Sequence, residues 1–136
     1  MNKTRQPTTA EINELIAFLP KLYGEGFEPV KQWHGGKQED KQIMTMPWPE
    51  YNRVVTDFFR TAGKECWCDY GYDPDQAGQM IRDADNVKNS SLDQVKTMLT
   101  YCVRGERFCD GHWGEMIERG TIRNLLERLT ELGSLM

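Results

Sequence analysis

The segment from Ser91 to Cys102 constrains the fold more than any other part of the chain. Ser91 and Gln94 have the spacing of a capping box, in which each side chain satisfies a free backbone N–H at the start of a helix. Apolar residues then recur at steps of three and four, the spacing that keeps them on one helical face. These residues are Leu92, Val95, Leu99 and Cys102. The pattern predicts a helix that buries one side against other elements.

Similar apolar spacing, bounded by helix start and stop signals, occurs along most of the chain. A helix after the capping box of Thr8 and Glu11 is expected to end or kink at Pro20. Others are expected from Pro49 to about Gly63, from Asp73 and Pro74 to about Asp83, around Trp113, and after Gly120. The sequence therefore predicts a mainly α fold, a compact single-domain bundle of about five or six helices over residues 1–136.

Two regions fall outside the helical pattern. Residues 1–7 are expected to form a frayed tail, and residues 24–46 an ordered loop or short strand region, with one strand at Ile43–Met46. The aromatic connector around Cys66 and Cys68 is expected to be extended.

Composition narrows the class of protein. The 136 residues suffice for one domain, and no apolar run is long enough to span a membrane. The N-terminus lacks the apolar stretch of a signal peptide, so we expect a cytoplasmic protein whose four cysteines stay reduced. A net charge of −4 disfavours nucleic acid as a partner, because such binding depends on clustered Lys and Arg.

A polar centre follows the Ser91 helix. If that helix continues, its apolar face meets Glu106, where a buried carboxylate needs a hydrogen bond or a cation. Arg104 and Arg107 are the nearest cations, and Asp110 is a candidate N-cap for the helix that contains Trp113. Gly105 favours an alternative, in which the helix ends near Arg104 and a turn follows.

Three interpretations of this centre remain open. It could be a structural ion-pair network where two helices meet. It could be a site in which Arg104, Glu106, Arg107, Asp110 and Trp113 bind an anionic small molecule or an acidic protein partner. It could also be catalytic, with Glu106 and His112 as the acid–base groups of a small hydrolase or transferase.

Other chemistry-bearing residues give weaker signals. Cys66, Cys68, Cys109 and His112 could supply four zinc ligands, but only one residue separates the first two thiols, so we predict neither a metal site nor a cofactor. If a ligand groove exists, we expect some of Trp33, Trp48 and Trp67 to line it. The leucines of the last helix fit either the core or the interface of a homodimer.

The segment "MLTYCVRGERFCDGHWGEMIERGTIRNLLERL" resembles the C-terminal half of a family of small bacterial proteins of unknown function. The shared motif is Leu-Thr-x-x-x-Arg-x-Glu-Arg-Phe, followed by an acidic or polar residue and Gly. The segments "LIAFLP" and "MPWPEY" are also similar to that family. The resemblance implies a small bacterial domain and draws attention to Arg104, Glu106, Arg107, Phe108 and Gly111, but it assigns none of them a role.

Overall fold

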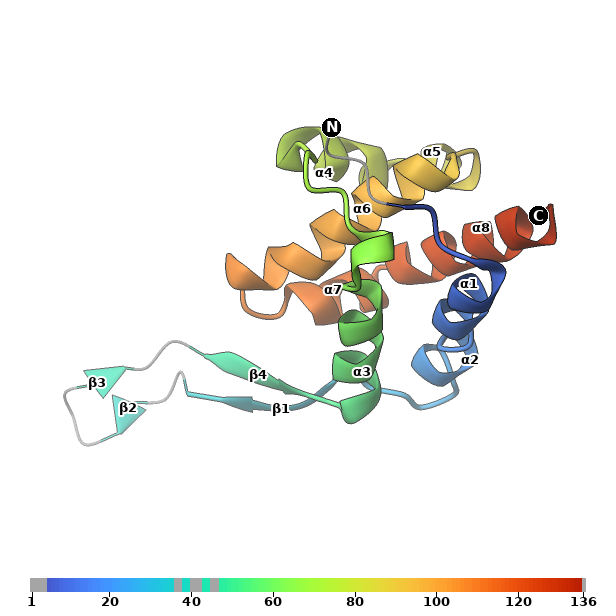
Figure 1. Ribbon diagram of the computed structural model, residues 1–136. Coiled ribbons are helices and arrows are strands. Elements are labelled where there is room, and N and C mark those ends of the chain that lie inside the picture. Colours follow the sequence, from blue (N-terminus) through green and yellow to red (C-terminus); the bar gives the residue numbers. More distant parts are fainter. Residues whose placement is uncertain (1–4, 36–37, 40–42, 45–46, 136) are drawn as a thin grey trace.

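The centre of the fold is formed by helices α6 (Leu92–Arg104) and α8 (Thr121–Ser134), which pack against each other. The computed structural model, which describes residues 5–35, 38–39, 43–44 and 47–135, is shown in Figure 1. Ser91 and Gln94 cap α6 as the sequence predicts. The apolar faces of both helices are fully buried: Val95, Met98, Leu99 and Cys102 on α6, and Ile122, Leu125, Leu126 and Leu129 on α8. The leucines of the last helix thus belong largely to the core.

The N-terminal helices cover one side of this centre. Helix α1 (Thr9–Ile16) packs on α8, and both α1 and α2 (Leu19–Leu22) contact α3 (Arg53–Ala62). The predicted capping box of Thr8 and Glu11 is present. The break between α1 and α2 falls before Pro20, which lies in the first turn of α2, where its missing N–H is tolerated.

Two short helices cover α6 and α8 elsewhere. Helix α4 (Pro74–Arg82) packs on α6 and begins at Asp73, as predicted, while α5 (Ala84–Lys88) packs on α8. The connector before α4 contains the 3-10 turn η1 (Glu65–Trp67) instead of an extended segment, and its Trp67 side chain is only 1% exposed. Trp67 is therefore a core residue and lines no groove.

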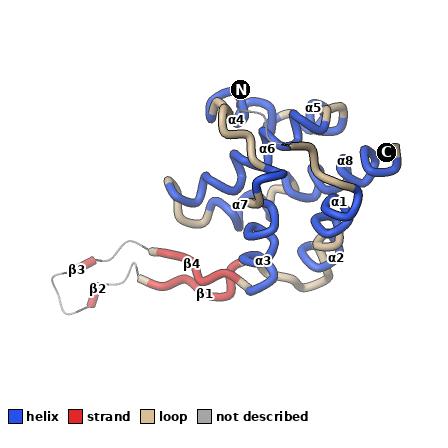
Figure 2. Tube along the Cα trace, viewed as in Figure 1, coloured by secondary structure: helices blue, strands red, loops and turns tan. Residues whose placement is uncertain are grey.

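A β-hairpin projects from the helical body (Figures 1 and 2). Strand β1 (Val30–His34) pairs antiparallel with β4 (Trp48–Tyr51), so that Val30 lies opposite Tyr51. Strands β2 (Gln38–Glu39) and β3 (Ile43–Met44) pair further out. The predicted strand at Ile43–Met46 is confirmed for its first two residues; the other two lie outside the described residues.

The helix expected from Pro49 begins later than predicted. Trp48–Tyr51 is held in β4 by its pairing with β1, and the Asn52 side chain caps α3 by accepting a hydrogen bond from Val54 N. Strand pairing thus overrides the helix-start signal of Pro49.

The described part of the N-terminal tail is docked instead of frayed. Gln6 donates a hydrogen bond to Asp93, and Lys96 Nζ donates one to the Arg5 carbonyl at 3.1 Å. Residues 1–4 lie outside the described residues. No helix in the described ranges is long and apolar enough to cross a membrane.

Candidate functional site

The chain reverses direction at the predicted polar centre. Helix α6 ends at Arg104, and a 3-10 turn, η2 (Gly105–Arg107), leads to helix α7 (His112–Glu118). Of the two predicted alternatives, the one in which the helix ends near Arg104 is therefore correct. Glu106 lies in the turn, where its carboxylate is partly buried.

The Glu106 carboxylate accepts hydrogen bonds from the start of α7. It accepts from the backbone N–H of Gly111 at 3.0 Å and of Trp113 at 2.8 Å. It also accepts from the hydroxyl of Tyr51 on β4 at 2.8 Å, and this contact together with burial raises the pKa of Tyr51. A carboxylate at a helix N-terminus satisfies N–H groups that have no partner within the helix. Glu106 thus joins the turn, α7 and the hairpin.

The arginine partners expected for Glu106 lie elsewhere. The Arg104 guanidinium is 5.7 Å from the ring centre of Tyr70 and 5.3 Å from that of Tyr72. Arg104 and Arg107 line a different hollow, and neither is ion-paired within the described part of the chain. The expectation that a guanidinium neutralises Glu106 is wrong, because backbone and phenol donors reach the carboxylate instead.

Asp110 and Trp113 also separate from the arginines. The N-cap of α7 is Gly111, in the left-handed conformation at φ 92°, and Asp110 makes no capping hydrogen bond. Trp113 packs in the interior: its indole stacks on Phe59 at 4.6 Å between ring centres and donates to the Val103 carbonyl. The five residues predicted to bind a ligand therefore do not converge on one pocket.

His112 lies beneath the turn and is only 7% exposed. A Cβ added at Gly105 would lie 2.3 Å from the His112 ring, so only glycine leaves room for it. Burial lowers the pKa of His112, and its Nε2 has no hydrogen-bond partner among the described residues. A histidine enclosed in this way is poorly placed to exchange protons with a substrate.

The zinc ligands considered from the sequence are not brought together. Within the described ranges, no group of three or more His, Cys, Asp or Glu side chains is arranged to hold a metal. Cys66 is buried, and burial with a hydrogen bond to Glu11 raises the pKa of its thiol to about 11, whereas Cys109 is exposed.

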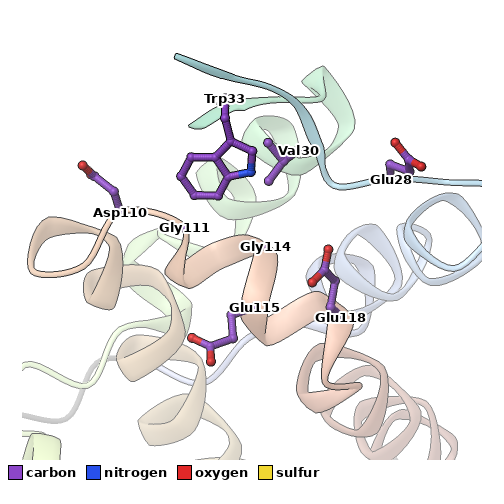
Figure 3. Close-up of a pocket in the computed structure, with 8 residues that line it drawn as sticks. All are labelled: Glu28, Val30, Trp33, Asp110, Gly111, Gly114, Glu115 and Glu118. Atoms are coloured by element: carbon purple, nitrogen blue, oxygen red, sulfur yellow. The ribbon is translucent and has the colours of Figure 1, made fainter. Parts of the chain in front are cut away.

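A hollow near the turn lies between the hairpin and α7 (Figure 3). It has a volume of about 550 Å³. We call it the acidic groove, and its lining residues are Glu28, Val30, Trp33, Asp110, Gly111, Gly114, Glu115 and Glu118. Four of them are acidic, and no Lys or Arg occurs among these lining residues.

Glycines on α7 allow the hairpin to approach closely. A Cβ at Gly111 would lie 2.9 Å from the Trp33 indole, and one at Gly114 would lie 3.2 Å from Val30. The Trp33 ring thus covers the start of α7 while its side chain stays 51% exposed (Figure 3). Trp33, one of the connector tryptophans expected to line a ligand groove, lines this hollow.

Most of the negative charge in the groove is uncompensated. Glu115 is ion-paired with Arg119, and in Figure 3 it points away from the hollow. Glu28, Asp110 and Glu118 have no ion-pair partner within the described part of the chain. Like charges around one hollow raise the free energy of the empty protein and produce a negative potential there.

Sequence reasoning missed most of this groove. A signal was present on α7: Gly111, Gly114, Glu115 and Glu118 follow steps of three, one and three, which place two glycines and two carboxylates near one face. Glu28 and Trp33 could not be assigned to that face, because their position depends on how the hairpin docks.

The fold and the groove define a mainly helical domain with an acidic hollow at the base of a hairpin. The chain belongs to a family of unknown function, DUF6508, whose model matches residues 7–134. This agrees with the resemblance to a family without an assigned activity. No curated protein and no solved structure matches the chain.

Proposed function

We propose that the protein is a binding domain whose acidic groove receives a segment of a partner protein that presents Lys or Arg side chains. The observation that carries this proposal is a hollow lined by the half-exposed Trp33 ring and by three carboxylates, those of Glu28, Asp110 and Glu118, that have no ion-pair partner among the described residues. Carboxylates attract a cation, and the face of a tryptophan ring adds a cation–π contact.

The shape of the surface supports an extended partner. An adjoining hollow of about 500 Å³ shares Glu28 and Val30 with the acidic groove and continues along the segment from Gly24 to Lys31. Its lining is of mixed charge, with Lys21 and Lys31 beside Glu25, so the basic side chains of the partner are expected in the acidic groove itself. Two adjoining hollows suit a stretch of chain better than a compact small molecule.

This proposal changes the ligand expected from the sequence. An anionic ligand would be repelled by the groove, whereas Arg104 and Arg107 line a separate hollow whose charge suits an anion. The hydrolase or transferase alternative gains no support from the geometry, because Glu106 is occupied by three donors and His112 is buried.

Binding of a fluorescein-labelled hexalysine peptide, measured by fluorescence anisotropy at low salt, tests the proposal. The triple variant Glu28→Gln, Asp110→Asn, Glu118→Gln should raise the Kd by about threefold to about a hundredfold, because each of the three exposed charge contacts contributes about 0.2–1 kcal/mol. The matched control is Glu65→Gln, Asp75→Asn, Glu127→Gln, which changes the net charge equally at acidic residues outside the groove.

A second pair of variants separates the aromatic contribution from the charge. Trp33→Ala should weaken hexalysine binding about threefold, the effect of one exposed cation–π contact. Trp48→Ala should leave binding unchanged, because Trp48 is 50% exposed but does not line the groove. Equal losses in the groove and control variants would show nonspecific attraction and would overturn the proposal.

A further inference from the structure

A separate hollow, about 200 Å³ in volume, lies where the C-terminal ends of α3 and α6 meet the connector after η1. We call it the arginine pocket. Arg104 and Arg107 line it together with Tyr70 and Cys68, and Ala62 and Val103 contribute apolar surface. Its lining residues include no Asp or Glu.

The two arginines differ from most others in the protein. Within the described residues, neither Arg104 nor Arg107 has a carboxylate partner, although the chain carries a net charge of −4. The ion-paired arginines are Arg5, Arg53, Arg60, Arg119 and Arg128. A single exposed arginine would be an ordinary solvated charge, but here two of them line one hollow.

The surroundings hold Arg104 beside the hollow. Its guanidinium lies 5.7 Å from the ring centre of Tyr70 and 5.3 Å from that of Tyr72, contacts that restrict its position while leaving N–H donors for another group. Asp69, a carboxylate on the same connector, accepts a hydrogen bond from the Thr97 hydroxyl at 2.7 Å. Asp69 does not line the pocket.

We infer that the arginine pocket binds a small molecule that carries a phosphate or carboxylate group on an apolar or aromatic body. Guanidinium groups donate paired hydrogen bonds to both kinds of oxyanion. The walls formed by Ala62, Val103 and Tyr70 suit the apolar part, and the volume limits the ligand to less than the usual size of a drug molecule.

NMR titration of the ¹⁵N-labelled protein with phenyl phosphate and, separately, with benzoate tests this inference. We expect saturable shifts of the Gly63 and Val103 amides with at least one of the two, and the tighter probe identifies the preferred oxyanion. Arg107→Gln should raise the Kd about tenfold, which corresponds to about 1.4 kcal/mol, because it removes a charge-assisted hydrogen bond to the oxyanion. Arg107 is exposed, so this substitution should leave the fold intact. Arg104→Gln should raise the Kd by a similar factor.

Arg82→Gln is the matched control, since Arg82 is also exposed and lies outside the pocket. Equal weakening by Arg82→Gln, or shifts that rise linearly without saturation for both probes, overturns the inference. Hexalysine binding by the Arg107→Gln variant should be retained, so failure at this pocket is distinguishable from failure of the acidic groove.

Discussion

The acidic groove and the arginine pocket draw on neighbouring residues of the chain but carry opposite charge. Arg104 and Arg107 line one hollow, and Asp110 and Gly111 line the other. Between them, Glu106 is turned inward onto the start of α7. A mixed cluster of charges in sequence is thus divided by one turn into a positive and a negative surface. The anionic ligand expected from the sequence therefore suits the charge of the arginine pocket but not that of the acidic groove.

The largest expected effect comes from filling the space that divides the two sites. Gly105→Ala places a methyl group against the His112 ring, which must shift. We expect a loss of roughly 2–3 kcal/mol in the free energy of unfolding, measured by urea denaturation, with weaker binding of both hexalysine and phenyl phosphate.

Gly78→Ala is the control for this change. A Cβ at Gly78 would meet only Tyr101 at an ordinary distance of 3.5 Å, and alanine is a better helix former than glycine by about 1 kcal/mol. The substitution in α4 should therefore stabilise the protein slightly. Destabilisation by both variants would show that the space above His112 is not special.

Glu106→Gln should have the next largest effect. The amide NH₂ of glutamine cannot accept a hydrogen bond. If it replaces Oε2, Gly111 N loses its acceptor, and if it replaces Oε1, both Trp113 N and Tyr51 Oη lose theirs. Leaving a partly buried donor unsatisfied costs about 1–3 kcal/mol, so the midpoint of thermal unfolding should fall by several degrees.

The comparison for Glu106 is Glu115→Gln, which removes an exposed ion pair with Arg119 and should cost at most about 1 kcal/mol. If both substitutions lower the free energy of unfolding equally, the hydrogen bonds of Glu106 do not stabilise the contact between the turn and α7. They would then not explain why the acidic groove and the arginine pocket lie apart.

The smallest expected effect is a dependence of stability on pH through His112. Burial lowers the pKa of His112 below its ordinary value of 6.5, Glu106 and Glu115 oppose this shift, and Arg119 adds to it. Below about pH 6.5, His112 is protonated more readily in the unfolded chain than in the folded protein. The free energy of unfolding therefore falls as the pH drops. His112→Gln should reduce this slope in denaturation curves measured between pH 5 and pH 8, and an unchanged slope would contradict the assignment.

The sequence predicted the helical part of the fold because its signals are local. The capping boxes at Thr8 and Ser91 and the Asp73 cap are all present, and the apolar face of α6 is buried. The pairing of β1 with β4 is not predicted, because these strands are separated in sequence and stabilise each other only by pairing, and Pro49 by itself resembles the start of a helix.

The candidate site was predicted less well than the fold, for a related reason. The sequence singled out Glu106 as a carboxylate that needs partners, and the structure supplies three of them. It could not show that Tyr51 is one partner, since that hydroxyl lies 55 positions away in the chain. Nor could it show that Glu28 and Trp33 join Asp110 around one hollow, because that depends on how the hairpin docks.

The Tyr51 contact also bears on how the molecule assembles. Closing a loop of 55 positions is slow compared with winding a helix, so the hairpin should dock after α6 has formed. Since Trp113 N and Tyr51 Oη share one oxygen of Glu106, local opening at the hairpin base should expose the Trp113 amide to solvent at the same time. That amide is thus a reporter for the movement of a strand to which it does not belong.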